Sequence, residues 1–314
     1  MKKIFTYLFL VVLCVSIVSC KRTGRPNDGW TDTMSSGLIR VSSDESFKSL
    51  MDQAISAFEI RFDSAFIIPR YTNETEAIRL LMDDSVRFAM TTRDLNAREA
   101  QVFKDKNRVV RSSVIAFDGI ALITNLANPD SIIGLPTLKK ILTGEIRTWS
   151  QINPKSKLDT IRVLFAGNQS SVLRYAIDSI ARGGTLSPHL YGNDLNSSAE
   201  VVQKVMKTPD AIGMIGFLKV PQDSVRMMRV SNEEKATLEN SYFPWAGDIV
   251  TENYPLWRPV YILISDPRSG LSTAFGVFLA NQVGQKVIQS AGLLTINNSN
   301  VRDVMVHNRF PQSN

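Results

Sequence analysis

IRVSSDESFKSLMDQAISAF, residues 39–58, reads as a short strand that runs directly into a helix. Residues 39–41 form the strand, and the apolar residues of 47–58 recur every three or four positions, which predicts a helix with one apolar face. Ser43, Asp44 and Ser46 stand where this helix must begin. The first N–H groups of a helix lack internal partners and carry the positive end of its dipole, so the junction predicts either an ordinary helix cap or an anion site.

The N-terminus carries a signal for export. Two lysines precede an apolar run at residues 4–18, and Ser19 then stands before Cys20. The pattern predicts a secretory signal peptide over residues 1–20 and resembles the bacterial lipoprotein signal, in which the cysteine is lipidated and becomes the first residue. The alternative is a transmembrane anchor, for which roughly 15 apolar residues are few. We expect a periplasmic protein that is lipid-anchored through Cys20 to a bacterial cell membrane.

Composition limits the remaining chain. Cys14 and Cys20 are its only cysteines, so one remains after cleavage and no internal disulfide can form. The formal net charge falls from +6 to +4 when Lys2 and Lys3 leave with the signal peptide. This mild positive charge suits a small anionic ligand or an anionic membrane surface, and no basic block is dense enough to predict nucleic-acid binding. Residues 21–37 are rich in Gly, Ser, Thr and Asp, which predicts a flexible tether.

Strands and helices alternate along the rest of the chain, which predicts an α/β fold. Further strands are expected at residues 66–69, 86–90, 114–125, 161–165, 211–217 and 260–264. Further helices are expected at residues 74–82, 135–142, 201–206 and 272–289, with one more that begins near Ser170. Residues 233–252 are polar and irregular, and the sequence contains no internal repeat.

Two later segments place polar residues where ligands bind in α/β folds. Ser170 and Ser171 stand in the first turn of a helix that follows a strand, and the alternative is again an ordinary cap. The strand at residues 86–90 delivers Thr92 and Arg93 to its carboxyl end, the edge at which open α/β sheets bind ligands. Arg93 either supplies a fixed positive charge to a ligand or pairs with a carboxylate such as Asp44 or Asp94.

Motifs of other classes are absent. The sequence has no phosphate loop, no dinucleotide-binding glycine motif and no nucleophile elbow. Neither of its two histidines, His189 and His307, has a partner at ligand spacing, so we predict no metal site, no histidine triad and no cofactor. A hydrolase that uses acidic residues such as Asp44 and Glu74 remains an alternative class without a positive signal.

Five segments, in this order, resemble the substrate-binding proteins of phosphate ABC transporters, which are two-lobed periplasmic binding proteins. The segments are VIAFDGIALITN at 114–125, ILTGEIRTWSQI at 141–152, AIGMIGF at 211–217, YPLWRPVYILI at 254–264 and FLANQVGQKVIQSAGLL at 278–294. The resemblance covers residues 39–294. It implies a type II-like α/β fold with mixed sheets, helices on both faces and a hinge of two chain crossings. The expected bounds are 38–115 and 252–310 for lobe 1, and 116–251 for lobe 2.

In that family, a phosphate is buried between the lobes by helix N–H groups, hydroxyls and an arginine. Matching residue by residue, the resemblance implies ligand contacts from Ser46, Phe47, Thr72, Asn73, Thr92, Arg93, Ser170 and Ser171. Thr92 lies where several members have an aspartate that accepts a hydrogen bond from protonated phosphate. The sequence departs from the pattern at Glu74, Thr75 and Glu76, which replace glycines, and at Val172, which has lost a hydroxyl. The arginine usual just before residues 170–172 is missing.

The resemblance implies an exported, lipid-anchored protein that captures a small tetrahedral oxyanion, with phosphate the first expectation, for an inner-membrane ABC permease. Such a protein is not an enzyme, and we expect a monomer. The alternative is a sensor or partner-binding lipoprotein of the same fold without a transport role.

Overall fold

The computed structural model describes residues 32–182, 185–188, 190, 194–221 and 223–296. The predicted signal peptide, Cys20, both histidines and residues 297–310 of the predicted first lobe lie outside this set. Within it, Asp32 is buried and its carboxylate accepts the N–H of Leu271 at 2.7 Å. The first strand already begins at Ser36. The folded part of the chain therefore includes residues 32–37, which the composition assigned to the tether.

A mixed sheet of nine strands runs through the described chain in the order β2-β1-β3-β11-β4-β7-β6, and β8 and β12 pair with β4. Its strands are β1 Ser36–Asp44, β2 Ser64–Thr72, β3 Phe88–Thr91, β4 Arg111–Thr124, β6 Arg162–Leu164, β7 Ala211–Gly216, β8 Arg226–Met227, β11 Trp257–Ile264 and β12 Leu294–Thr295. Strands β1, β2 and β3 are mutually parallel, as are β6 and β7, whereas β11 is antiparallel to both β3 and β4. A small second sheet consists of β5 Ile132–Gly134, β9 Arg229–Ser231 and β10 Ser241–Tyr242.

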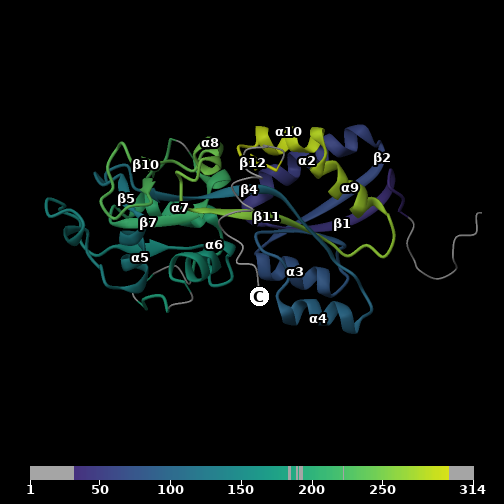
Figure 1. Ribbon diagram of the computed structural model, residues 1–314, viewed down its shortest axis with the longest axis horizontal. Coiled ribbons are helices and arrows are strands. Elements are labelled where there is room, and N and C mark those ends of the chain that lie inside the picture. The colour runs from purple at the N-terminus through teal and green to yellow at the C-terminus, as the bar shows by residue number, and fades with distance from the viewer. Residues whose placement is uncertain (1–31, 183–184, 189, 191–193, 222, 297–314) are drawn as a thin grey trace, which may run out of the picture. The chain divides into compact units, whose positions relative to one another are not determined.

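Helices cover both faces of the large sheet (Figure 1). The α-helices are α2 Lys48–Arg61, α3 Glu74–Met82, α4 Ala97–Asp105, α5 Leu135–Thr143, α6 Ser171–Tyr175, α7 Ser198–Lys207, α8 Ala246–Val250, α9 Leu271–Ala280 and α10 Gln282–Ser290. Short 3-10 turns are η1 Glu45–Phe47, η2 Trp149–Gln151 and η4 Phe217–Lys219, and α6 continues as the π-helical turn η3 Ala176–Ile180. None of the described helices is both long and apolar enough to cross a bilayer.

Two sequence predictions were wrong in detail. The helix predicted at residues 272–289 is two helices, because Asn281 is extended and its side chain caps α10 by accepting the N–H groups of Val283 and Gly284. Gly284 permits the tight junction, since a Cβ there would lie 2.1 Å from the carbonyl oxygen of Phe278. The segment 233–252, expected to be irregular, contains β10 and the short helix α8.

Successive side chains along β3 and β11 point to opposite faces of the sheet, and each face carries its own apolar layer. Phe88 and Met90 of β3 pack under α2, α9 and α10, whereas Ala89 between them packs under α3 and α4. Strand β11 repeats the pattern with Ile262 on the first side and Leu263 on the second. Figure 1 shows these two groups of helices on opposite faces of the sheet. The period of two that predicted the strands therefore also positions the helices.

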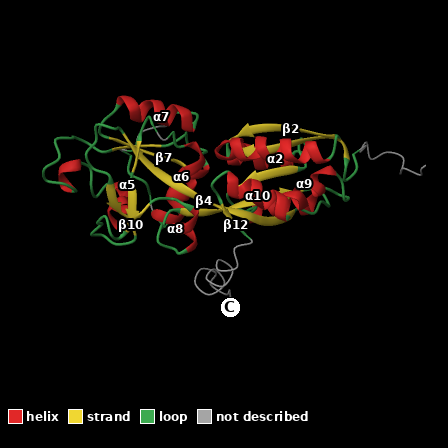
Figure 2. Cartoon of the chain, turned by 90° about the horizontal axis from the view of Figure 1, so that it is seen from above, coloured by secondary structure: helices red, strands yellow, loops and turns green. Residues whose placement is uncertain are grey.

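A second pair of cores lies farther along the same sheet, around β4, β6 and β7. The boundary falls within the two long strands: Ala116 of β4 belongs to the first core, and Phe117 to the second. Leu256, just before β11, packs in the second core and Val260 in the first. Figure 2 shows β4 passing between the two groups of elements. We call these groups the first and second lobes, and the exact residues at which one lobe ends and the other begins stay a prediction.

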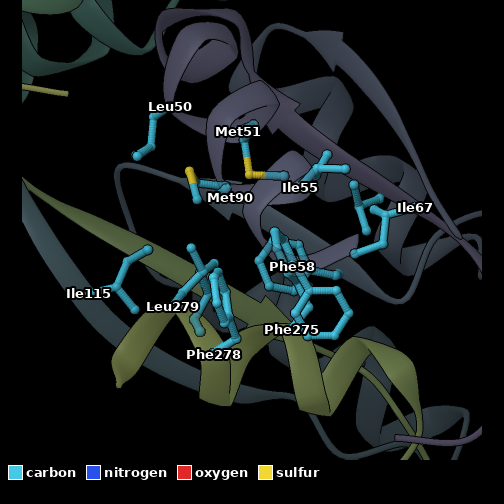
Figure 3. Packing of buried hydrophobic residues seen from close by; sticks show 14 of the residues in the cluster. Leu50, Met51, Ile55, Phe58, Ile67, Met90, Ile115, Phe275, Phe278 and Leu279 are labelled. Atoms are coloured by element: carbon cyan, nitrogen blue, oxygen red, sulfur yellow. The ribbon is translucent and has the colours of Figure 1, made fainter. Parts of the chain in front are cut away.

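Aromatic rings hold the first lobe together (Figure 3). The ring of Phe58 on α2 lies 4.8 Å from that of Phe62 and 5.4 Å from those of Phe275 and Phe278 on α9. Phe58 is fully buried. This cluster joins α2 to α9, a helix more than 200 residues later in the chain. The chain therefore returns to the first lobe after it has formed the second.

We predict that Phe58→Ala lowers the free energy of unfolding by about 3 to 5 kcal/mol, because it leaves a cavity among three rings. Urea unfolding followed by circular dichroism measures the loss. Ile60→Ala on the same helix is the control: Ile60 is 83% exposed, so its truncation should change stability by no more than about 0.5 kcal/mol. Equal losses in the two variants would contradict this packing.

Candidate ligand-binding site

A cavity of about 600 Å³ is lined by residues of both lobes. The first lobe contributes the carboxyl ends of β1 and β2 with the turns that follow them, and the second lobe contributes the segment after β6 and the start of α7. The lining residues are Asp44, Glu45, Ser46, Lys48, Tyr71, Thr72, Asn73, Ala166, Gly167, Asn168, Gln169, Ser170, Ser171, Val172, Asn196, Ser198, Met214 and Lys219. Five of the eight predicted ligand contacts are in this set: Ser46, Thr72, Asn73, Ser170 and Ser171.

The first helix start of the cavity follows β1. Asp44 caps it, since its Oδ1 accepts the N–H of Ser46 at 2.9 Å, and the tight turn η1 leads into α2. Ser46 is buried against the cavity wall. The side chain of Phe47 lies in the core of the first lobe instead, so only its backbone can serve a ligand.

The second helix start follows β2. The side-chain oxygen of Asn73 accepts the N–H of Glu76 at 2.9 Å and so caps α3. Thr72 and Asn73 both line the cavity. Strands β1 and β2 are parallel and adjacent, and Asp44 is the direct partner of Thr72, which is why two helix starts reach the same place.

The third helix start belongs to the second lobe. Ser170 caps α6 by accepting the N–H of Leu173 at 3.1 Å, as the cap interpretation of the sequence expects. Ser171 is the first residue of α6, and its Oγ accepts a hydrogen bond from Nη1 of Arg258 at 2.8 Å. A hydroxyl that accepts from a guanidinium still has its own proton to donate. Ser171 can therefore donate to an acceptor in the cavity.

Arg258 contacts the cavity-lining residue Ser171 and was not among the predicted ligand contacts, although it stands in the YPLWRPVYILI segment. It lies opposite Asp118 where β11 pairs with β4, and its Nε donates to Oδ2 of that carboxylate at 3.0 Å. Both side chains are 1% exposed. Burial raises the pKa of Asp118 to about 6, against the opposing charge of Arg258. The guanidinium also lies over the ring of Phe47, 5.7 Å from its centroid, and so adjoins both lobes.

Thr92 and Arg93 lie beside the cavity but do not line it. The N–H and the hydroxyl of Thr92 both donate to Oε1 of Glu74 at 2.6 Å. Arg93 binds the two carboxylate oxygens of Glu99 at 2.7 and 2.8 Å, and its Nε lies 3.5 Å from Oε2 of Glu74. Arg93 is thus paired with carboxylates, though not with the two that the sequence suggested, and a ligand role for it stays a prediction.

Glu74 joins the lobes beside the cavity. Its Oε2 accepts Nε of Arg174 from α6 at 2.7 Å, and Nη2 of Arg174 donates to the hydroxyl of Thr92 at 2.8 Å. Burial alone would raise the pKa of Glu74, but the charge of Arg174 and the hydrogen bonds from Thr92 outweigh it and lower that pKa. Both carboxylate oxygens of Glu74 accept hydrogen bonds from the protein, so this side chain links the two lobes. These contacts give no support to the alternative in which Glu74 is a catalytic acid.

Glu45 makes a second contact between the lobes. Its Oε1 accepts both the N–H and the hydroxyl of Ser198, the first residue of α7, at 2.9 and 2.7 Å. A carboxylate at a helix N-terminus satisfies free N–H groups and interacts favourably with the helix dipole. No local signal in the sequence pairs Glu45 with a residue 153 positions away. The described residues contain no group of three or more His, Cys, Asp or Glu side chains placed to hold a metal ion.

We predict that Glu74→Gln lowers stability at pH 7 by about 2 to 4 kcal/mol, since it removes charge-assisted hydrogen bonds and leaves Arg174 partly uncompensated. The pKa of Glu74 is lowered in the folded state, so its contribution is complete above its ordinary value of 4.5 and is lost as the pH falls through the lower folded value. The difference between wild type and variant should therefore shrink in acid.

Denaturant unfolding between pH 3 and pH 7 measures this difference. Glu234→Gln is the matched control, because Glu234 forms an exposed ion pair with Lys140, which is worth at most about 1 kcal/mol. A Glu74→Gln loss that is small at pH 7, or that does not change with pH, would count against the buried bridge.

A family model described as the PBP superfamily domain matches residues 28–283. The phosphate-binding protein PstS of Borreliella burgdorferi is 22% identical over 302 residues, which are 94% of this chain and 99% of that protein.

Two solved structures have the same fold. A Clostridium perfringens protein, described as a phosphate ABC transporter substrate-binding protein with bound phosphate, aligns with a TM-score of 0.70 at 22% identity and covers 83% of this chain and 100% of that one. An ABC-type phosphate transport receptor of Vibrio cholerae aligns with a TM-score of 0.62 at 24% identity and covers 82% and 100%. The α/β, two-lobed fold class predicted from the sequence is thereby confirmed.

Proposed function

Because the chain belongs to the PBP superfamily, we propose that it is an exported solute-binding protein that captures a small tetrahedral oxyanion, phosphate first among them, in the cavity between its lobes. It would deliver the anion to an inner-membrane ABC permease and would act by binding, without catalysis. The phosphate-binding relative that spans nearly the whole chain supports phosphate as the first ligand to test.

One observation carries this proposal: helix starts from both lobes, with Ser46 on one side and Ser170 and Ser171 on the other, line one cavity. N–H groups at helix starts and hydroxyls are the donors that an oxyanion needs. Lys48 and Lys219 balance the charge of the two carboxylates in the lining, those of Asp44 and Glu45. The site can therefore surround a small anion with donors from two directions.

The energetics suit reversible capture. A micromolar dissociation constant corresponds to about 8 kcal/mol. Several charge-assisted hydrogen bonds, at about 1.5 to 3 kcal/mol each, can supply this after the cost of ordering the lobes, so neither a metal nor a cofactor is required. The crossing strands β4 and β11 would serve as the hinge about which the lobes move.

We predict that the purified protein binds phosphate and that a concentration of about 100 times the dissociation constant stabilises it by about 2.7 kcal/mol. Ser171→Ala should weaken binding about tenfold or more, because it removes a hydroxyl that donates to the anion. Isothermal titration calorimetry and thermal unfolding measure both effects.

Ser49→Ala is the control for this loss, since Ser49 is exposed on α2 and does not line the cavity. No heat and no thermal shift with phosphate, sulfate or arsenate would contradict the proposed function and favour a sensor or partner-binding role for the same fold.

We propose further that the protein is a monomer held at the membrane by lipid on Cys20, in the periplasm. Cys20→Ala should abolish lipid attachment and leave unprocessed or soluble protein, because residues 21–37 contain no apolar stretch that could anchor the chain. Metabolic lipid labelling and detergent partitioning measure attachment, and phosphate binding by the variant serves as the control for folding. Lipid labelling that persists in Cys20→Ala would exclude this cysteine as the anchor.

A further inference from the structure

The first lobe carries exposed apolar side chains on one face of its sheet. Leu38 of β1 is 53% exposed, and Phe66 and Ile68 of β2 are 55% and 46% exposed. Leu38 is the direct partner of Phe66, and side chains two positions apart on a strand share a face, so the three side chains lie together. We call these three residues the apolar patch. Adjacent exposed apolar residues of this kind mark an interaction surface.

The apolar patch is on the face of the sheet opposite to the aromatic cluster. Ile39 and Ile67, which alternate with the patch residues, are buried in the core beneath α2 and α9. On the patch face, α3 packs over the later part of β1, where the hydroxyl of Ser42 donates to the carbonyl oxygen of Ala77 at 3.0 Å. The patch therefore occupies the earlier part of the same face, beyond the end of this helix contact.

The free edge of β2 is protected against pairing with another strand. Strand β2 is the last strand on its side of the sheet. The N–H of Ile67 donates to Oε1 of Glu59 at 2.8 Å, and Pro69, two residues later, has no N–H to donate. Such features prevent edge-to-edge association of sheets. We therefore expect a partner of the apolar patch to cover its face and not to extend the sheet.

The segment that follows Cys20 joins the folded chain at this place. Asp32 lies against the start of β1, since a Cβ on Gly37 would come within 2.7 Å of its Cα. The N–H of Thr33 donates to the carbonyl oxygen of Ser36 at 2.8 Å and closes the turn that leads into the strand. Asp32 follows Cys20 by 12 residues. A flexible segment of that length spans about 20 Å on average and at most about 43 Å.

We propose that the apolar patch rests on the anionic lipid surface to which the protein is anchored, so that the first lobe docks on the membrane. This inference rests on the lipid anchor at Cys20 in the proposed function, and it adds a second, reversible membrane contact on the folded domain. A lipid on Cys20 would hold the patch within the reach of the short tether.

The charges beside the patch suit an anionic surface. Arg40 is exposed, lies opposite Ile68 on the same face, and its side chain forms no ion pair or hydrogen bond with the described residues. The side chain of Arg70 is 60% exposed and lies 3.4 Å from Glu76. An arginine can lay its apolar stem on the interface while its guanidinium reaches lipid phosphates. A small patch binds weakly alone, but the anchor makes this contact intramolecular and raises its effective concentration.

The first experiment uses the lipidated protein with a matched pair of introduced thiols. Once Cys20 carries lipid, the mature chain has no free thiol, so Ser64→Cys or Ser56→Cys supplies a single one. Ser64 is exposed on the same face of β2 as Phe66, whereas Ser56 is exposed on α2, which packs on the opposite face.

Each thiol is labelled with a nitrobenzoxadiazole fluorophore. The protein is then reconstituted in vesicles of phosphatidylcholine and phosphatidylglycerol that contain a spin-labelled quencher lipid. We expect the quencher to act about fivefold more strongly on the label at position 64 than on the label at position 56, because only the former faces the bilayer.

Two further changes in the Ser64→Cys protein test the residues of the surface. Phe66→Thr with Ile68→Thr removes the apolar groups but retains side chains that favour strands, and should reduce quenching at least about threefold. Arg40→Gln should reduce about twofold the excess of quenching in vesicles with phosphatidylglycerol over vesicles of phosphatidylcholine alone. Circular dichroism checks that these exposed substitutions leave the fold intact.

The outcomes separate this inference from the proposed function. Equal quenching at positions 64 and 56, or quenching that Phe66→Thr with Ile68→Thr leaves unchanged, overturns membrane docking while the anchor and phosphate binding stand. A label at position 64 that is shielded from water but not quenched by lipid would place protein, a second copy or another chain, on the patch and would also overturn it. Failure of Cys20 to take up lipid overturns the anchor, and this inference with it.

Discussion

The buried ion pair of Arg258 and Asp118 is the interaction on which the geometry of the site depends. The two residues face each other across β11 and β4, the antiparallel strands that run between the lobes, and both are 1% exposed. Removing one partner of such a pair typically costs about 3 to 5 kcal/mol, because the other charge is left buried alone. From this fixed position Arg258 donates to Ser171 of the second lobe and covers the ring of Phe47 in the first. One guanidinium therefore links the strand crossing to helix starts on both sides of the cavity.

The departures of this chain from the phosphate-binding pattern contact one another. The resemblance implies that Glu74 takes the place of a glycine and Thr92 that of an aspartate, and the two are joined by a hydrogen bond of 2.6 Å. Arg174 then binds both of them from the second lobe. The three side chains therefore form one hydrogen-bonded network in which the buried carboxylate of Glu74 is balanced by Arg174. This network lies outside the cavity lining, which is formed by the helix starts.

Sequence reasoning succeeded where a signal is local. The helix starts near Asp44 and Ser170 were predicted because a cap needs only a polar residue ahead of an apolar period, and both residues do cap. Contacts between distant segments could not be predicted in this way: Arg174 and Glu74 are 100 residues apart, and Arg258 and Asp118 are 140 apart. The apolar period also predicted one continuous helix across Asn281. The structure has two helices there, because the side chain of Asn281 caps the start of α10. The sequence therefore predicted helix starts that line the cavity but not the buried charged pairs beside it.

The two contacts between the lobes have a consequence for any ligand that binds between them. Glu45 with Ser198, and Glu74 with Arg174, are bonds that the protein makes with itself in the arrangement in which both lobes line the cavity. Charge-assisted bonds of about 1.5 to 3 kcal/mol each favour that arrangement before a ligand arrives. A ligand shifts a conformational equilibrium only by the difference between its affinities for the two conformations. Its apparent affinity is the intrinsic affinity multiplied by the fraction of molecules in the conformation that can bind it. Under the proposed function, these bonds would keep the fraction of binding-competent molecules high, and release of the ligand would require that the same bonds be broken.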